Sequence, residues 1–259
     1  MSGGEITGRS LQDQVALVTG SSRGIGAAIA TRFAQAGAHV VVHGRDVEAL
    51  ERVRREIEAD GVRAIAVVAD LTDAARVERM HAEIEDRAGP VDILVANAGG
   101  SPVPPGPIEQ ITEEAWRASI DVNLTATFLT IRSVLPGMKA RGRGCIITMS
   151  SAAARRPHPG SPVAYAAAKA GIELLTKDLA AQAGPFGVRA ACIAPETIMT
   201  ERNQQQIPAD LQENLVMTHP IRRLGTPEDV AEAALFLASD GASWISGVVL
   251  DVAGGSVLV

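Results

Sequence analysis

The chain has 259 residues, of which 46% are hydrophobic and 21% charged, and its 24 Lys and Arg against 30 Asp and Glu give a net charge of −6. These proportions are typical of a globular protein and exclude an intrinsically disordered or collagen-like chain. An acidic chain lacks the broad basic surface that polyanions require, so we expect no nucleic-acid partner and no membrane partner.

Membrane-span, signal-peptide and cysteine patterns in the sequence bear on where the protein is expected to be located. No apolar run reaches the roughly 20 residues of a membrane span, and residues 1–14 contain no signal-peptide core. Cys145 and Cys192 are the only cysteines, and each lies in an apolar segment. We therefore expect a cytoplasmic protein with two free, buried thiols.

Short apolar runs alternate with longer amphipathic stretches along the chain. In order, the runs that predict buried strands are 15–18, 40–42, 64–69, 91–96, 145–149, 188–193 and 248–252. The stretches that predict helices lie between them, the first ending at 36 and the others covering 47–59, 73–88, 112–138, 164–183 and the residues from 227 onwards. Asp46 and Thr112 are the expected N-caps of the second and fourth of these helices.

This alternation predicts the fold class. Parallel strands need a crossover connection and are buried on both faces. We expect an α/β fold, a Rossmann-like doubly wound sheet of about seven parallel strands with helices on both faces. No linker or composition shift divides the chain, so residues 1–259 are expected to form a single domain with a flexible start at 1–11.

Two segments interrupt the regular pattern. Residues 99–107 are rich in Pro and Gly, and residues 195–220 are polar with a weak helical pattern. Both follow predicted strands, so both are expected at the carboxyl edge of the sheet, where such folds bind ligands. We predict that 195–220 forms the substrate loop.

A glycine-rich segment joins the first predicted strand to the first helix. It reads Thr-Gly-Ser-Ser-Arg-Gly-Ile-Gly over 19–26, where backbone N–H groups and a helix N-terminus can bind a nucleotide diphosphate. A P-loop is excluded because no Gly-Lys-Ser/Thr follows, and the spacing is not Gly-x-Gly-x-x-Gly. Taken alone, the segment is also compatible with a turn that binds no ligand.

Three further motifs stand in register with this one. Asn97-Ala98-Gly99 follows the fourth strand, Asn123 follows Asp121-Val122, and Tyr165-x-x-x-Lys169 lies downstream of Ser150-Ser151. Together the four motifs resemble the short-chain dehydrogenase/reductase family over residues 12–255. The resemblance implies a single NAD(P)-binding Rossmann domain, and the similar members include 3-oxoacyl-carrier-protein reductases and ketone, sugar and secondary-alcohol dehydrogenases.

Tyr165 and Lys169 are four residues apart, so their side chains share one helix face. An interfacial tyrosine with a snorkelling lysine is the alternative, but Tyr165 is the only tyrosine in the chain. The resemblance implies hydride transfer between a nicotinamide and a carbonyl carbon, with Tyr165 as general acid/base and Lys169 lowering the pKa of its phenol. It also implies that Lys169 binds the nicotinamide ribose and that Asn123 orders a water molecule.

The serine position departs from the family pattern. The family places it thirteen residues before the tyrosine, which here is Ala152, whereas Ser151 lies fourteen before. We interpret this as a one-residue insertion in 152–163 and assign Ser151 to hold the substrate oxygen, with Ser150 in reserve.

The end of the second strand indicates the cofactor. Members that prefer NAD carry an acidic residue there, whereas this chain has Gly44 followed by Arg45. Arg45 can pair with a 2′-phosphate, and Arg23 occupies the other basic position of NADP-preferring members. Asp46 is a rival ribose ligand that we interpret as a helix cap. We predict NADP(H), with an NAD(H)-dependent alcohol or sugar dehydrogenase as the alternative.

Other cofactor contacts also follow from the resemblance. Asp70-Leu71 matches an adenine-binding acid, although Asp70 is also a candidate helix cap in competition with Thr72. Glu196 replaces a glycine in the segment that contacts the carboxamide and is a candidate to face the substrate instead. The predicted cofactor site comprises Gly20, Ser22, Arg23, Gly24, Ile25, Gly26, Arg45, Asp70, Leu71, Asn97, Ala98, Gly99, Tyr165, Lys169, Pro195, Ile198 and Thr200.

The remaining patterns concern substrate and partners. Arg155, Arg156 and His158 are candidates to attract an acidic or carrier-borne acyl substrate, with a solvated loop as the alternative. Ala253 replaces a common aspartate and is assigned to packing or subunit contact. No histidine pair has metal-ligand spacing, and no Gly-x-Ser-x-Gly elbow is present. A homotetramer or homodimer acting on a small carbonyl or alcohol is expected, and a non-catalytic nucleotide sensor is the alternative.

Overall fold

A computed structural model describes residues 10–157 and 160–257 of the chain. One parallel sheet runs through these residues with the strand order β3-β2-β1-β4-β5-β6-β7. The strands are β1 (Val15–Val18), β2 (His39–Gly44), β3 (Ala64–Val68), β4 (Ile93–Ala96), β5 (Gly144–Met149), β6 (Val188–Pro195) and β7 (Val249–Val252). The predicted Rossmann-like α/β fold is confirmed, and each predicted strand is present within two residues at either end.

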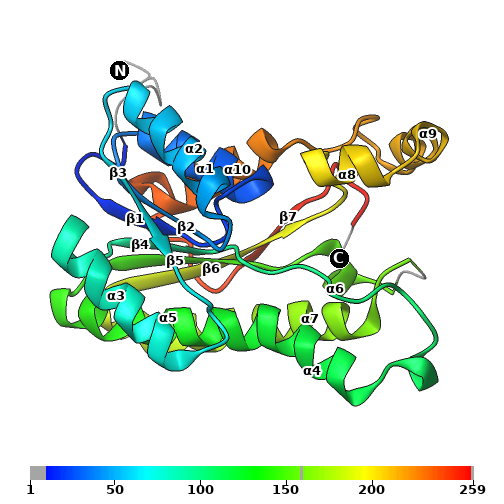
Figure 1. The fold of residues 1–259 in the computed structure, drawn as a ribbon, viewed down its shortest axis with the longest axis horizontal. Coiled ribbons are helices and arrows are strands. Elements are labelled where there is room, and N and C mark those ends of the chain that lie inside the picture. The colour runs from blue at the N-terminus through cyan, green and yellow to red at the C-terminus, as the bar shows by residue number, and fades with distance from the viewer. Residues whose placement is uncertain (1–9, 158–159, 258–259) are drawn as a thin grey trace.

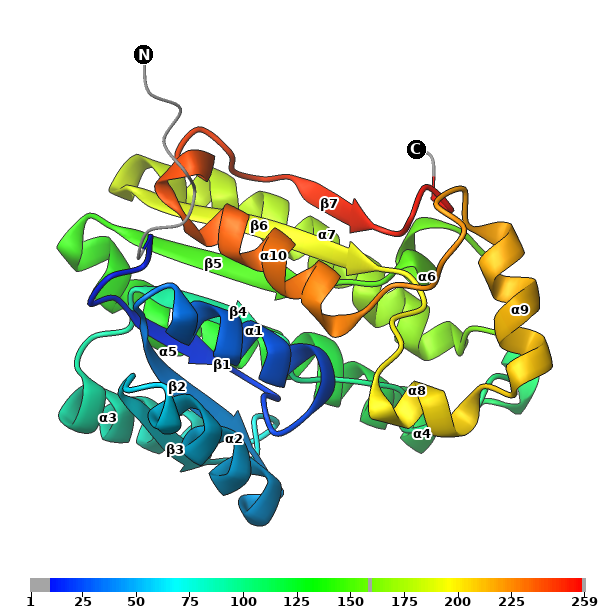
Figure 2. The ribbon, with the colours of Figure 1, turned by 90° about the horizontal axis from the view of Figure 1, so that it is seen from above.

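Helices cover both faces of the sheet, as Figure 1 shows. One face carries α1 (Gly24–Gln35), α2 (Val47–Ala59) and α10 (Pro227–Ala238). The other carries α3 (Ala74–Ala88), α4 (Glu113–Ile120), α5 (Ala126–Arg141) and α7 (Val163–Ala183). Beyond the carboxyl ends of the strands lie α6 (Ala152–Arg155), α8 (Glu201–Gln206) and α9 (Ala209–Thr218), which Figure 2 shows at one end of the sheet.

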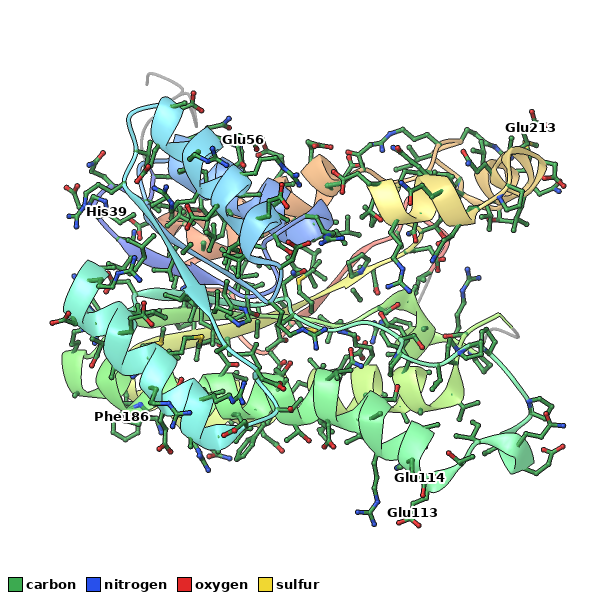
Figure 3. The ribbon with its side chains drawn as sticks, in the orientation of Figure 1. His39, Glu56, Glu113, Glu114, Phe186 and Glu213 are labelled. Carbon is green, nitrogen blue, oxygen red and sulfur yellow. The ribbon has the colours of Figure 1, made fainter. Side chains whose placement is uncertain are left out.

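The two-layer core follows from the alternation of side chains along each strand. In β1, Ala16 and Val18 belong to the core beneath α1, whereas Val15 and Leu17 belong to the core beneath α3 and α5. Because central strands such as β1, β4 and β5 contribute to both cores, their apolar runs are buried, which is why these runs stand out in the sequence. The edge strands β3 and β7 are partly exposed. Figure 3 shows labelled acidic side chains, including Glu56 and Glu213, pointing outward from the helices.

Capping residues fix where the helices begin. Asp46 caps α2 by accepting from the Ala49 N–H, and Thr112 caps α4 by accepting from the Ala115 N–H, so both predicted caps are confirmed. The cap of α3 is Asp73, which accepts from two backbone N–H groups. Asp70 and Thr72 therefore do not cap that helix.

The helix predicted over 112–138 is interrupted. After α4, a π-helical turn η2 (Asp121–Thr125) inserts one extra residue before α5 begins. A uniform apolar pattern carries no signal for this insertion, because both flanking segments remain helical. Two short helices in 195–220, α8 and α9, and the four-residue α6 were also not predicted.

The N-terminal segment is more ordered than predicted at Leu11, whereas the two cysteines are buried as predicted. Leu11 is fully buried and its N–H donates to the Ala36 carbonyl, so it is part of the fold, whereas residues 1–9 of the expected flexible start lie outside the described residues. Cys145 and Cys192 are buried free thiols, as expected. In the part of the chain that is described, no helix is long and apolar enough to cross a membrane.

Candidate active site

A cavity of about 780 Å³ opens at the carboxyl ends of the central strands. All the residues predicted to contact the cofactor line it, from the glycine-rich turn after β1 to the segment after β6. The two ends of this set also meet each other, because a Cβ on Gly24 would lie 3.2 Å from Thr200 Cγ2. The cavity therefore brings together segments that are almost 180 residues apart in the sequence.

The glycine-rich turn has a geometry that larger residues cannot adopt. Gly20 and Gly24 have φ angles of +66° and +56°, in the left-handed region. Gly26 is required for a different reason, since a Cβ there would lie 2.3 Å from the Gly20 carbonyl oxygen. The turn thus carries the first turn of α1 close to the end of β1.

The start of α1 is suited to an anion. Arg23, its N-cap residue, makes no side-chain cap hydrogen bond, and the first turn contains no acidic residue. By contrast, α2, α3 and α4 are capped by their own side chains. Uncapped N–H groups and the positive end of the helix dipole lining a cavity fit the diphosphate of a dinucleotide.

His43 braces the glycine-rich turn from β2. Its Nδ1 accepts from the Gly20 N–H at 3.3 Å, and its Nε2 lies 3.2 Å from the Ala69 carbonyl oxygen. Both contacts are satisfied by one neutral tautomer, with the proton on Nε2. Burial lowers the pKa of His43 to about 4, which keeps the imidazole in this neutral form at neutral pH.

Tyr165 and Lys169 lie one turn apart on α7 at the inner end of the cavity. Lys169 Nζ donates to the Met149 carbonyl oxygen at 2.7 Å and lies 5.6 Å from the centre of the Tyr165 ring. Burial lowers the pKa of Lys169 to about 8. Burial also raises the pKa of the Tyr165 phenol, and hydrogen bonding with the Ser151 side chain opposes that increase.

The two neighbouring serines face different surroundings. Ser151 lies beside Tyr165 on the cavity wall and caps α6 by accepting from the Ala153 N–H at 3.2 Å. Ser150 also borders the cavity, but it is only 4% exposed, and its hydroxyl contacts Glu173 Oε1 at 2.8 Å and the Lys169 carbonyl oxygen at 3.2 Å. The geometry therefore favours Ser151 over Ser150 as the serine that meets a ligand.

Asn123 lies in the π-helical turn and is fully buried. Its amide exchanges two hydrogen bonds with the Gly100 backbone, at 3.0 and 2.8 Å, and also donates to the Ser119 carbonyl oxygen. A Cβ on Gly99 would lie 2.6 Å from Asn123 Oδ1 and 3.5 Å from Lys169 Nζ. Asn123 and Lys169 thus approach the same glycine from two sides, although Asn123 does not itself line the cavity.

Two arginines and two carboxylates lie at the opposite end. Arg23 forms an ion pair with Asp46, whose carboxylate also caps α2. Arg45 lines the cavity and forms no ion pair within residues 10–157 and 160–257. Thr72 donates its N–H and hydroxyl to Asp70 at 3.0 and 2.7 Å, and these bonds lower the pKa of that carboxyl.

Comparison with known proteins agrees with this geometry. Residues 20–256 match the family described as enoyl-(acyl carrier protein) reductase. Dehydrogenase/reductase SDR family member 4 of Homo sapiens is 39% identical over 248 residues, covering 95% of this chain and 88% of that protein. This chain belongs to the short-chain dehydrogenase/reductase (SDR) family. It is an oxidoreductase that acts on CH–OH groups.

Solved structures of SDR proteins resemble the chain over almost its whole length. A 3-oxoacyl-acyl-carrier-protein reductase with bound NAD from Brucella melitensis has a TM-score of 0.90 and 34% identity, with coverage of 100% of this chain and 99% of that chain. A gluconate 5-dehydrogenase from Burkholderia cenocepacia J2315 in complex with NADP and tartrate has a TM-score of 0.89 and 34% identity, with coverage of 95% and 96%. SDR proteins of this fold therefore bind either nucleotide.

The loop arginines of this SDR chain do not behave as the substrate hypothesis expects. Arg155 is bound to Glu173 and Asp251 in the interior, so it is not free to attract an acidic substrate. Arg156 lies 3.6 Å from Glu196, and His158 lies outside the described residues. Glu196 lines a second cavity of about 350 Å³ rather than the main one. That part of the hypothesis is wrong for Arg155, because two carboxylates distant in sequence neutralise it.

Other departures from the family pattern have local explanations. The positive φ near the replaced glycine falls on Thr197, at +31°, and not on Glu196. Ala253 is buried and packs with Ala152 of α6, which supports its assignment to packing. His43 and Glu173 are the residues that sequence reasoning missed. Their only signal was a polar side chain inside an otherwise apolar strand or helix face.

Proposed function

We propose that this SDR protein interconverts a carbonyl and a secondary alcohol with NADP(H), and that Tyr165 is its general acid/base. The observation that carries the proposal is the convergence of Ser151, Tyr165 and Lys169 at the inner end of one cavity whose other end fits a nucleotide diphosphate. A bound nicotinamide would exchange a hydride with the substrate carbon. Asn97, Pro195, Ile198 and Thr200 would hold that part of the cofactor.

Side chains of the protein would deliver the proton to the substrate oxygen and remove it. Ser151 holds the substrate oxygen beside the phenol, and Tyr165 donates its proton to that oxygen during reduction or removes it during oxidation. A lysine cation at ~5 Å and an effective dielectric of ~20 stabilises a phenolate by about 3 kcal/mol, or roughly 2 pKa units. In this proposal the cation acts, with the Ser151 hydrogen bond, against the burial that raises the Tyr165 pKa. Asn123, next to Lys169, would order the water that returns the proton.

The nucleotide preference is supported by charge. Gly44 leaves no carboxylate at the end of β2, and Arg45 has no ion-pair partner in the described ranges. Arg45 is thus free to bind a 2′-phosphate, and the neighbouring Arg23 adds a second cation. A preference for NAD is the alternative, because the solved relatives include complexes with each nucleotide. A single domain, a cytoplasmic location and a homodimeric or homotetrameric state remain predictions.

The deciding experiment is the Tyr165→Phe variant. We expect its kcat for NADPH-dependent ketone reduction to fall by a factor of ~10²–10⁴, the usual contribution of a positioned acid. NADPH binding, measured by fluorescence titration, should be retained because the ring stays in place. The wild type should first be screened over ketones, 3-oxoacyl thioesters, sugars and steroids.

Two results would contradict the proposal. Equal turnover by Tyr165→Phe would remove Tyr165 from the reaction. A wild type that binds NADPH but reduces no carbonyl in the screen would favour a nucleotide sensor. Lys177→Met is the control for a substitution elsewhere on α7. It should keep the turnover of the wild type, because Lys177 is exposed and does not line the cavity.

A further inference from the structure

Arg155 and two carboxylates, Glu173 and Asp251, form a nearly buried cluster next to the part of the cavity that Ser151 and Tyr165 line. Arg155 donates from Nε and Nη2 to the two oxygens of Asp251 at 3.0 and 3.2 Å, and from Nη1 to Glu173 Oε2 at 3.0 Å. The Arg155, Glu173 and Asp251 side chains are only 16%, 10% and 19% exposed. The cluster joins α6, α7 and β7 through a fork geometry that a lysine cannot reproduce.

Glu173 connects this cluster to the catalytic residues. It lies one turn beyond Lys169 and two turns beyond Tyr165 on α7, so the helix fixes its position relative to both. Its other oxygen, Oε1, accepts from the Ser150 hydroxyl at 2.8 Å. The residue before Ser151 is therefore tied to the same carboxylate that binds Arg155.

The residues after Ser151 are tied to that carboxylate as well. Ser151 is the N-cap of α6 and Arg155 is its last residue, so the two ends of one helical turn are joined by its backbone hydrogen bonds. Ala152, the first residue of the turn, is buried against Ala253 and Val257. Ser151 is thus held from both sides, by Ser150 through Glu173 and by α6 through Arg155.

We propose that Arg155 is a positioning residue that sets the placement of Ser151 against Tyr165 by binding Glu173 and Asp251. Arg155 does not line the main cavity. Without the guanidinium fork, α6 loses its simultaneous hydrogen bonds to Glu173 on α7 and Asp251 on β7, even where a lysine keeps the charge. The two carboxylates then lie in a nearly buried region where their remaining repulsion is weakly screened, so α6 shifts and carries the Ser151 hydroxyl with it. The inference rests on the proposed role of Ser151 beside Tyr165.

The test uses Tyr165 as its own reporter. Because Tyr165 is the only tyrosine, protein grown on 3-fluorotyrosine gives a single fluorine NMR resonance whose shift follows the ionisation of the phenol. Fluorination also lowers the phenol pKa and brings the titration to milder pH. Arg155→Lys, which keeps the charge but loses the fork, should raise the phenol pKa in the same direction as Ser151→Ala, because the Ser151 hydrogen bond is weakened in both.

A double-mutant cycle separates positioning from general destabilisation. Arg155→Lys should lower kcat about tenfold in the wild-type background and less than about twofold in the Ser151→Ala background, with NADPH affinity unchanged. Asp251→Asn, which keeps the side-chain shape, should behave in the same way if Arg155→Lys fails to fold. Arg117→Lys is the control, since Arg117 is 72% exposed, pairs with Glu113 on α4 and does not line the cavity.

Equal, additive losses in both backgrounds would overturn the inference, and so would an unchanged phenol titration in Arg155→Lys and Asp251→Asn. The NMR readout requires no turnover. If the wild type reduces no carbonyl, the proposed function fails while the titration still decides whether Arg155 places Ser151. If the wild type turns over and the cycle shows no coupling, only this inference fails.

Discussion

Arg23 and Asp46 form an ion pair across the outer end of the nucleotide cavity, and the same Asp46 carboxylate caps α2. Asp46 thus stabilises the start of α2 and partly neutralises Arg23, which is proposed to bind the cofactor. Arg45, the residue before Asp46, remains without an ion pair in the part of the chain described here. The positive charge that a 2′-phosphate would meet therefore depends on Arg23 and Arg45, less the part of Arg23 that Asp46 neutralises.

Exchange of these groups should alter nucleotide preference in opposite directions. Arg45→Ala should weaken NADPH binding by about 10- to 100-fold, the value of a hydrogen bond to a charged group, while NADH binding changes little. Dissociation constants for both nucleotides, measured at one fixed ionic strength, would show this. A higher kcat/KM with NADH in the wild type, or unchanged NADPH affinity in the variant, would contradict the NADP preference.

Asp46→Asn should instead tighten NADPH binding by about two- to fivefold, because an exposed ion pair is worth about 1 kcal/mol or less. Asparagine is as good an N-cap as aspartate, so α2 should remain intact. Circular dichroism and the same nucleotide titrations would test both parts. Weaker binding of NADPH would show that Asp46 is a nucleotide ligand rather than only a cap and counter-ion.

The two adjacent serines should give different phenotypes. Ser151→Ala should lower kcat about 100-fold with an unchanged KM for NADPH, because a donor to the developing oxyanion is lost. Ser150→Ala removes the donor to Glu173 and should lower the free energy of unfolding by about 1–3 kcal/mol, with a smaller effect on kcat. Steady-state kinetics and urea denaturation distinguish them, and the reverse pattern would return the catalytic assignment to Ser150.

His43 should make stability depend on pH. Its pKa falls from 6.5 in the unfolded chain to about 4 in the folded protein, so protonation favours unfolding. The contribution is fully present above pH 6.5 and is lost as the pH falls toward 4, by about 3 kcal/mol in all. His43→Asn keeps an acceptor for the Gly20 N–H but does not titrate.

The measured quantity is the difference in unfolding free energy between wild type and His43→Asn across this range, because carboxylates titrating in both proteins then cancel. That difference should decrease as the pH falls. A constant difference for His43→Asn would show that His43 is not held neutral by burial.

Gly26→Ala tests the close approach at the glycine-rich turn. Its methyl group would lie 2.3 Å from the Gly20 carbonyl oxygen and 2.6 Å from Asn97 Nδ2, so both must move. We expect a loss of about 1–3 kcal/mol in stability from overpacking, together with weaker NADPH binding. Gly184→Ala is the control, because no atom lies within 4 Å of a Cβ there, and unchanged NADPH affinity in Gly26→Ala would contradict this account.

Local features of the sequence predicted most of the fold and the residues that line the outer end of the main cavity. The runs that form β1 and β6, the Asp46 cap and the glycine-rich turn each depend on a few consecutive residues. Arg155 could not be interpreted in the same way, because its partners are 18 and 96 residues away and are joined to it only in the folded chain. The difference between Ser150 and Ser151 likewise depends on which one the end of β5 turns inward.

The π-helical turn at Asp121–Thr125 determines more than the position of Asn123. One extra residue in a helix rotates everything after it by about 100°, so this turn also determines which side of α5 faces the sheet. The buried stripe that includes Leu129, Val134 and Met138 is in phase with the core only because of that rotation. We therefore expect a single-residue deletion in this segment to turn the stripe toward solvent.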